Sequence, residues 1–244
     1  MKLGMAIDLD RCIGCRTCAT ICKNHNSEPE GIWWNRVFTL GSNEHQVAYE
    51  SAAGEYQLDF LPLSCQHCDN PSCVKVCPTG ASYVDDDGVV LVDYERCIGC
   101  RYCISACPYQ VRQFNWDDPK PRKEMGEDKY IYGWPLDYRK EGRLVYTQNR
   151  PKGVVEKCTF CAQYTAEGEK PACVRGCPMN ARVFGDLEDP QSDISKYLDG
   201  RQFTRLKEES GNSPKVFYIK SGSKEKPALY DRFNTMGATS GKEM

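Results

Sequence analysis

The distribution of cysteine is the feature that most constrains this 244-residue chain, which contains sixteen cysteines. They form four groups of four and leave none over: Cys12, Cys15, Cys18 and Cys22; Cys65, Cys68, Cys73 and Cys77; Cys97, Cys100, Cys103 and Cys107; and Cys158, Cys161, Cys173 and Cys177. Disulfide frameworks this dense usually occur in secreted chains shorter than about 100 residues. Cysteines separated by two residues pair poorly with each other but are well placed to bind one metal centre. The grouping therefore predicts metal sites and not disulfides.

The chain contains an internal repeat that relates the four groups. "RCIGCRTCATIC" (11–22) returns as "RCIGCRYCISAC" (96–107), and "PSCVKVCPTGA" (71–81) returns as "PACVRGCPMNA" (171–181). Self-similarity of this kind has to be identified before a fold is inferred. The order of motifs is A, B, A′, B′. The fourth group is thus a second copy of the second, lengthened by a polar loop that surface segments tolerate.

The first and third groups have the spacing C-x2-C-x2-C-x3-C. In bacterial ferredoxins three cysteines of such a run bind one [4Fe–4S] cluster and the fourth binds the neighbouring cluster. Proline follows the last cysteine of the second, third and fourth groups, where a residue without an N–H suits the turn, whereas Lys23 follows Cys22. Taken alone, the fourth group has the two-pair spacing of a structural zinc site. The first and third groups are too tightly spaced to close on one zinc ion, and the repeat extends the cluster interpretation to the other two.

The remaining sequence predicts a small-sheet α+β protein. The fourth cysteine of a group is expected at the start of a short helix, with helices beginning within 74–76 and 104–106. A strand, an Asp/Gly turn and a second strand are expected over 81–97. Further strands are expected over 5–10, 181–187 and 215–219. Strand, cluster loop, helix and strand, occurring twice, form two ferredoxin-like two-cluster units.

Composition excludes some functions. The net charge of −2 and the sequence pI of about 6.0 give no electrostatic case for a nucleic-acid partner. No stretch approaches the roughly 18 consecutive apolar residues that a membrane span needs. The first residues lack the basic start, apolar run and cleavage site of a signal peptide. The chain by itself is expected to be soluble and to have no direct membrane span.

With four motifs in this order, residues 3–187 resemble the iron–sulfur electron-transfer subunits of the dimethyl-sulfoxide-reductase family of molybdenum and tungsten enzymes. The stretches "LSCQHCDNPSCVKVCPTGA" (63–81), "EKCTFC" (156–161) and "GDLEDPQS" (185–192) are similar to that family as well. The family includes the small subunits of dimethyl sulfoxide, arsenate, polysulfide, thiosulfate, tetrathionate and nitrate reductases and of formate dehydrogenases. The pattern is specific for the subunit class and much less so for the substrate.

The resemblance implies four [4Fe–4S] clusters and pairs the first motif with the fourth and the second with the third. In order from the catalytic partner, the implied ligand sets are Cys12, Cys15, Cys18 and Cys177; then Cys22, Cys158, Cys161 and Cys173; then Cys77, Cys97, Cys100 and Cys103; and finally Cys65, Cys68, Cys73 and Cys107. Some relatives carry a [3Fe–4S] cluster in place of one cubane, but this chain has Cys100 at the position concerned.

The implied domain organisation follows from that pairing. Residues 1–60 with 150–190 form one ferredoxin-like unit, and residues 61–115 form the other. An insertion over 116–149 is expected to dock a partner, because aromatic residues are enriched at interfaces. A C-terminal segment and tail complete the chain over 191–244. The aromatic residues of the insertion on which docking rests are Tyr130, Tyr132, Trp134 and Tyr138.

The implied function is relay of single electrons between a large molybdopterin subunit and a membrane quinone-linked or other redox partner, in an anaerobic respiratory reductase or dehydrogenase. No residue resembles a substrate-handling catalyst. A free-standing soluble polyferredoxin is the alternative, and a zinc-stapled interaction module is a more distant one. Location stays open: catalytic partners of this family often carry a twin-arginine signal and export the small subunit with them, to the periplasmic or cell-surface face, and otherwise the chain is cytoplasmic.

Two further predictions concern residues beside the cysteines. Arg16, Arg101 and Arg175 lie in or next to the cluster loops and could raise a neighbouring potential, or could equally be solvated or partner-facing. His67 lies inside the second motif, which already has four cysteines, so hydrogen bonding or packing is expected of it and not metal ligation.

Overall fold

A computed structural model describes residues 1–40, 49–50, 54, 56–117, 137–147 and 151–220. The aromatic residues Tyr130, Tyr132 and Trp134 and the tail over 221–244 lie outside this part of the chain. The docking role expected of that segment therefore stays a prediction.

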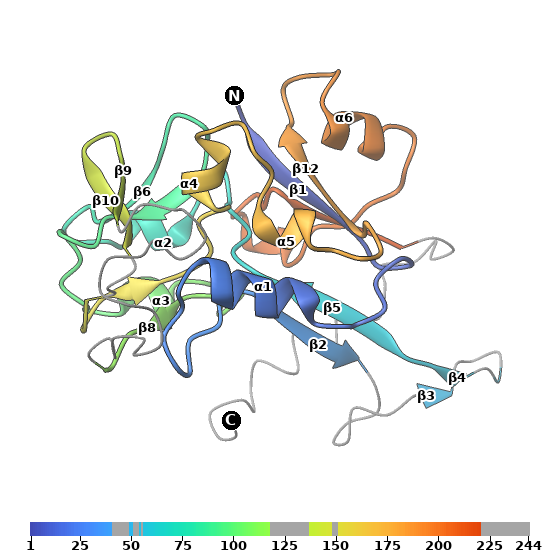
Figure 1. Cartoon of the computed structure of the whole chain (residues 1–244), viewed down its shortest axis with the longest axis horizontal. Helices are drawn as coiled ribbons and strands as arrows, with labels where there is room; N and C mark the ends of the chain where they lie inside the picture. Colours follow the sequence, from blue (N-terminus) through green and yellow to red (C-terminus); the bar gives the residue numbers. More distant parts are fainter. Residues whose placement is uncertain (41–48, 51–53, 55, 118–136, 148–150, 221–244) are drawn as a thin grey trace, which may run out of the picture.

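A three-stranded sheet joins the beginning of the chain to its later part (Figure 1). Strand β1 (Leu3–Asp8) lies in the centre, antiparallel to β12 (Arg182–Asp186) and parallel to β13 (Val216–Ile219). All six residues of β1 are buried. Helix α6 (Asp193–Leu198) packs on the sheet, where Ile194 joins Ala6 and Ile219 in one apolar cluster. The strands expected in these three regions are confirmed: β12 and β13 are slightly shorter than predicted, and β1 begins and ends two residues earlier than predicted.

The cysteine motifs carry short helices. These are α1 (Thr17–His25), α2 (Ser72–Lys75), α3 (Tyr102–Ser105) and α5 (Ala172–Arg175), and the lengthened loop of the fourth motif adds α4 (Ala162–Thr165). The expectation that the fourth cysteine begins a helix is wrong. The helices begin earlier and contain the third cysteine, and in three motifs the fourth cysteine follows the helix end. The proline after those three cysteines explains the ending, because the residue before a proline is disfavoured in the α region.

The remaining strands form two-stranded antiparallel ribbons, as expected for an α+β protein of small sheets. The pairs are β2 (Arg36–Leu40) with β5 (Asp59–Leu63), β3 (Tyr49–Glu50) with β4 (Tyr56–Gln57), β6 (Ser82–Val84) with β7 (Val90–Val92), β9 (Asp137–Lys140) with β10 (Arg143–Thr147), and β8 (Gln113–Phe114) with β11 (Val155–Glu156). A 3₁₀ turn, η2, spans Glu208–Ser210. The β6–β7 turn is fixed by Asp85, whose carboxylate accepts the Val89 N–H at 2.7 Å and the Asp87 N–H at 3.1 Å.

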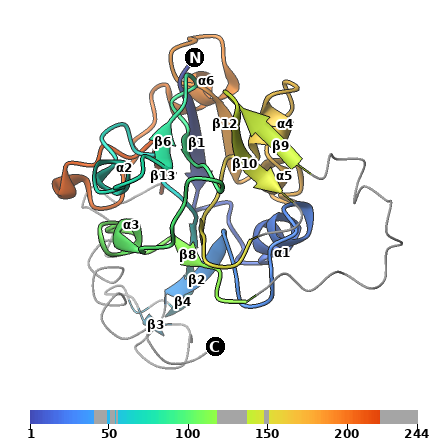
Figure 2. The ribbon, with the colours of Figure 1, turned by 90° about the vertical axis from the view of Figure 1, so that its left-hand side faces the viewer.

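The motif helices lie in two groups on opposite sides of β1. Figure 2 shows α2 and α3 on one side and α1, α4 and α5 on the other. Helix α1 contacts α5, and α2 contacts α3, so the first motif lies beside the fourth and the second beside the third. One buried core runs through both groups and includes cysteines beside large apolar residues such as Trp34, Leu61 and Phe160. Within the described ranges, no helix has the length and apolar character to cross a bilayer.

Four cysteine-lined cavities as candidate metal centres

Four cavities account for all sixteen cysteines, four to each. The first is lined by Cys12, Cys15, Cys18 and Cys177, the second by Cys22, Cys158, Cys161 and Cys173, the third by Cys65, Cys68, Cys73 and Cys107, and the fourth by Cys77, Cys97, Cys100 and Cys103. Their volumes are similar, at about 370, 280, 320 and 310 Å³ in that order. Every cysteine is a free thiol. We refer to these sets as the first, second, third and fourth quartets.

Each quartet combines cysteines from two motifs. Three come from one motif and one comes from the end of its partner motif, as the resemblance implies. The exchange is reciprocal: the fourth motif supplies Cys177 to the first quartet, and the first motif supplies Cys22 to the second. In the same way, Cys77 and Cys107 cross between the third and fourth quartets. Metal binding by the quartets stays a prediction.

The repeated CIGCR sequence folds the same way in both of its copies. Gly14 and Gly99 have φ angles of +68° and +69°, and Arg16 and Arg101 both have φ of +61°. These left-handed residues curl the loop, so that its two sulfurs face the same cavity as the third sulfur, which lies in the first turn of the helix that follows. Glycine takes this conformation without steric cost, and other residues do so only under local constraint.

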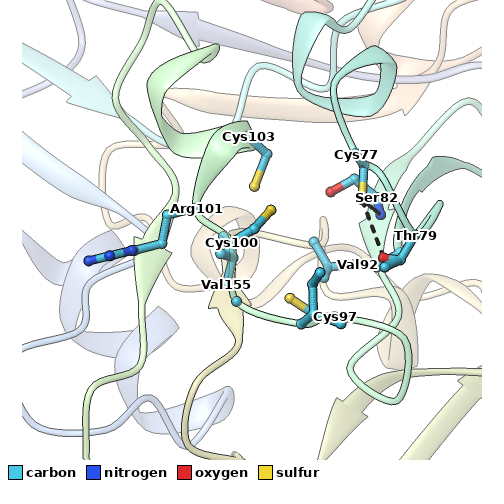
Figure 3. Close-up of a pocket in the computed structure, with 12 residues that line it drawn as sticks. Cys77, Thr79, Ser82, Val92, Cys97, Cys100, Arg101, Cys103 and Val155 are labelled. Carbon is cyan, nitrogen blue, oxygen red and sulfur yellow. Dashed lines mark hydrogen bonds between the residues drawn. The ribbon is translucent and has the colours of Figure 1, made fainter.

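Donors approach several of the cysteine sulfurs. Backbone N–H groups of Ser82 and Ala181 lie 3.3 Å from the sulfurs of Cys77 and Cys177. Figure 3 shows the fourth quartet, with Ser82 and Thr79 beside Cys77 and the Arg101 side chain turned away from the cysteines. Burial raises the pKa of Cys77, but the N–H of Ser82 and the contacts of Thr79 outweigh it and lower that pKa from its ordinary value. Such donors favour thiolate, the form that binds metal.

Burial differs strongly between the quartets. All four cysteines of the second quartet are buried, as are three of the third, whereas Cys15 of the first and Cys100 of the fourth are exposed. Burial raises the pKa of Cys22 well above its ordinary value. Burial and the neighbouring Cys173 thiol raise the pKa of Cys161 to about 12. Buried thiolates of this kind need a nearby positive charge, which iron ions would supply.

The donor set fits a metal cluster, because four cysteines line each cavity and the four cavities are similar in size. Buried Arg112 and Arg182 direct guanidinium nitrogens at cysteine sulfurs, 3.0 Å from Cys73 and 3.5 Å from Cys18. A buried cation without a counter-charge is costly, so these arginines also fit negatively charged cysteine centres.

The second and third quartets are neighbours. The His67 ring, between Cys65 and Cys68, stacks on the Phe160 ring, between Cys158 and Cys161, with centroids 3.7 Å apart. Burial raises the pKa of Cys158 well above its ordinary value, and Cys65 is among the thiols that add to the rise. This contact favours the set of Cys65 as the third site and the set of Cys97 as the last, the reverse of the final two places in the implied order. It arises from packing of the 65–68 loop against the 158–161 loop.

The structure also places the basic residues singled out in the sequence. Arg16, Arg101 and Arg175 are exposed. Arg101 lies over the rings of Phe114 and Trp116, and Arg175 pairs with Glu169 at 2.5 Å. His67 is fully buried and accepts the Val90 N–H at Nδ1 over 3.2 Å, which agrees with the packing and hydrogen-bonding role expected.

The arginines nearest the sulfurs, Arg112 and Arg182, were not identified from the sequence. Each lies five residues after the fourth cysteine of its motif, Cys107 and Cys177. Aligning the repeats at that cysteine shows an arginine at the same position in the third and fourth motifs. The second motif has Ser82 there. The sequence signal was therefore present, but an arginine side chain is ordinarily taken as exposed.

Comparison with known proteins agrees with this architecture. Sequence models of the 4Fe–4S dicluster domain match residues 11–81, 56–129 and 96–182. A Halobacterium salinarum protein assigned as a dimethyl sulfoxide reductase iron–sulfur subunit is 43% identical over 225 residues, which cover 88% of this chain and 78% of that protein. The arsenate respiratory reductase iron–sulfur subunit of Shewanella sp. strain ANA-3 is 40% identical, covering 91% of this chain and 97% of the relative. A tetrathionate reductase subunit of Salmonella typhimurium is 37% identical, covering 89% and 72%.

Proposed function

This chain belongs to the iron–sulfur subunits of the dimethyl-sulfoxide-reductase family, and from that premise we propose how its parts carry out electron transfer. As a member of that family, it is an iron–sulfur electron-transfer subunit of a molybdopterin respiratory reductase or dehydrogenase. The observation that carries the proposal is the division of all sixteen cysteines among four cavities, each completed by a partner motif.

Each quartet would hold one [4Fe–4S] cluster, which supplies one-electron storage without a proton. The chain's own residues do the rest: they fix the order of the sites, exclude water from the inner two and donate hydrogen bonds to sulfur. Hydrogen bonding, burial and nearby charge are the means by which proteins set cluster potentials. Because the partner's two-electron chemistry has to be served by one-electron carriers, the sites act in sequence.

The proposed sequence runs from the first quartet to the fourth in the numbering used above. The buried second and third quartets form the interior of the row, and the partly exposed first and fourth quartets form its ends. Both ends present the same loop, with Ile13 55% exposed beside Cys12 and Ile98 67% exposed beside Cys97. Exposed apolar side chains beside a redox site suit contact with a partner protein.

The proposed partners are a large molybdopterin subunit at the first quartet and a quinone-linked membrane subunit or other redox protein at the fourth. The fourth-quartet end also exposes Tyr102 and Trp116. We retain the division into a unit of 1–60 with 150–190, a unit of 61–115, a docking insertion over 116–149 and a C-terminal segment from 191 onward.

Purification of the tagged chain from its native host tests this function. The expected result is co-purification of one large molybdopterin-containing subunit, with about sixteen iron atoms per copy of this chain if all four cubanes are present. Recovery of the chain alone, with full iron content and rapid exchange of electrons with unrelated redox proteins, would support a free-standing polyferredoxin instead. Zinc in place of iron would overturn both.

Docking by the insertion has its own test. Replacing Tyr132 and Trp134 by serine is expected to weaken association with a partner while iron content stays unchanged. Association that is unaltered in the double variant would count against docking through this segment. The single variants Ile13→Ser and Ile98→Ser report separately on the two exposed cluster loops.

A further inference from the structure

Among the buried cationic side chains of the described residues, Lys215 pairs with Asp69, whereas Arg112, Arg182 and Lys157 occupy positions that no part of the electron-transfer scheme above requires. Arg112 and Arg182 are each 4% exposed, and Lys157 is 1% exposed. Long charged side chains are almost never buried unless a counter-charge accompanies them. Their neighbours show where that counter-charge has to come from.

Arg182 lies between the first and second quartets. Its Nη2 is 3.5 Å from the sulfur of Cys18 in the first quartet, and its Nη1 is 3.8 Å from the sulfur of Cys173 in the second. Its other contacts are to uncharged acceptors, Asn35 Oδ1 at 3.1 Å and Met5 Sδ at 3.4 Å. One guanidinium thus contacts a cysteine of each quartet.

Arg112 occupies the corresponding place between the third and fourth quartets. Its Nη2 is 3.0 Å from the sulfur of Cys73 in the third quartet. Its Nη1 donates to Ser82 Oγ at 2.8 Å, and the backbone N–H of Ser82 donates to the sulfur of Cys77 in the fourth quartet. Burial lowers the pKa of Arg112, but thiols of both quartets, Cys73 and Cys103 foremost, outweigh it and raise that pKa above its ordinary value.

Lys157 lies at the middle junction, where the second quartet meets the third. Its ammonium donates to the backbone carbonyl of Cys158, in the second quartet, at 2.7 Å. It also donates to the carbonyl of Val90, a residue that lines the cavity of the third quartet. Within the described ranges, the contacts of Lys157, Arg112 and Arg182 include no ion pair with a carboxylate.

This lack of carboxylate partners among the described residues distinguishes the three cations from an arginine such as Arg175, which pairs with Glu169. A buried ion pair with Asp or Glu would cancel the positive charge locally, and its field would not reach the sulfurs. Here the guanidinium groups of Arg112 and Arg182 are directed at cysteine sulfurs, and the Lys157 ammonium is directed at carbonyls of residues that line two quartets. All three lie in a low-dielectric interior, where electrostatic interactions are strong. The guanidinium stays protonated throughout, so the effect is a fixed charge and not a titration.

We propose that Arg182, Lys157 and Arg112 are three junction cations, each placed between two successive cluster sites and each raising the reduction potential of both sites that it separates. Each stabilises the extra negative charge that a site gains on accepting one electron. Because neighbouring sites share a cation, their potentials are raised together, which favours electron transfer in either direction along the row. The inference rests on the proposed function, since it requires clusters in the quartets.

The test is a redox titration of the purified, iron-loaded complex, monitored by electron paramagnetic resonance, in Arg182→Gln, Lys157→Gln and Arg112→Gln. Each variant is expected to lower the midpoint potentials of two of the four clusters. Arg182→Gln and Arg112→Gln should move different, non-overlapping pairs, and Lys157→Gln should move one cluster of each pair. This overlap pattern identifies the junctions without prior assignment of the signals, and a merely structural role would not produce it.

Matched controls separate a junction charge from any charge near a cluster loop. Arg16→Gln, Arg101→Gln and Arg175→Gln remove exposed arginines and are expected to shift potentials far less. A second set of variants keeps each arginine but places a carboxylate beside it, which offsets its positive charge. Asn35→Asp beside Arg182 and Ser82→Asp beside Arg112 should lower the midpoint potentials of the same pairs of clusters as the glutamine variants. If Arg182→Gln or Arg112→Gln fails to retain iron, the aspartate variants carry the test.

Iron-loaded junction variants with unchanged potentials would overturn the inference, as would both arginine variants moving the same pair. Shifts in the exposed-arginine controls as large as those in the junction variants would also overturn it. Failure of the proposed function is distinguishable, because it would appear in the unaltered protein as the lack of four iron–sulfur clusters.

Discussion

Gly99, in the CIGC loop of the fourth quartet, is the position where one methyl group should perturb a cluster site most directly. Its φ is +69°, and a Cβ built there would lie 2.1 Å from the carbonyl oxygen of Gly153 and 3.0 Å from Phe114. The Gly153 segment cannot easily retreat, because the Gly153 N–H bonds to the Asn115 carbonyl at 2.8 Å and the Asn115 N–H bonds to the Val154 carbonyl at 2.9 Å. Gly80, with φ of +65°, has no atom within 4 Å of its built Cβ and provides a matched control.

The expected magnitudes follow from the two contributions. Alanine in the left-handed region costs about 1–2 kcal/mol, and this cost applies to both Gly99→Ala and Gly80→Ala. Forcing a backbone shift in a packed region adds about 1–3 kcal/mol, and this applies only to Gly99→Ala. For a chain of this size each kcal/mol lowers the melting temperature by roughly 2–4 °C. Gly99→Ala should therefore melt roughly 2–12 °C below Gly80→Ala.

The assay is loss of cluster absorbance on heating, at one scan rate for both variants, with iron content measured beforehand. Gly99→Ala is expected to lose iron selectively from one site, because the CIGC loop supplies two ligands to the fourth quartet. Equal melting temperatures and equal iron contents for the two variants would refute the reasoning, since the steric overlap with Gly153 would then have no consequence.

Three further predictions follow from the core, the quartets and the buried histidine. Removal of iron by chelation should unfold the chain cooperatively, because the cysteines form part of the core and structural metals supply folding free energy; an iron-free protein with the far-UV circular dichroism of the holo form would contradict this. Cys177→Ser should eliminate the cluster signal of the first quartet and Cys22→Ser that of the second, whereas a self-contained fourth motif would make Cys177→Ser and Cys173→Ser alter the same signal. Burial and the positive charge of Arg175 lower the pKa of His25 in the folded chain. Because His25 in the unfolded chain then binds a proton more readily, stability should decline as pH falls below about 6.5. Denaturation midpoints at pH 7.5 and 5.5 should differ less in His25→Gln than in the unaltered protein, and an equal difference would exclude His25 as the cause.

The local features of the cluster sites could be predicted from the sequence because they depend on short-range spacing. The CIGCR loop needs glycine at its left-handed position, three sulfurs at three-residue intervals face one cavity, and a proline ends the helix that precedes Cys107 or Cys177. The strand before Cys12 and the β6–β7 turn around Asp85 likewise depend on residues close in the chain. The α+β class follows from these local units.

Long-range placement was decided by tertiary packing, for a physical reason. The third quartet lies beside the second because the His67 ring stacks on Phe160, a contact between residues 93 positions apart that no local pattern encodes. Arg112 and Arg182 are buried against the sulfurs of Cys73 and Cys18, which lie far from them in the sequence, although an arginine side chain ordinarily favours water. The sequence by itself determined the four cysteine groups and their repeat, and its resemblance to a family implied which cysteines share a site. Only the folded chain brought the second quartet against the third and placed buried arginines beside the cysteines, because both depend on which surfaces pack against each other.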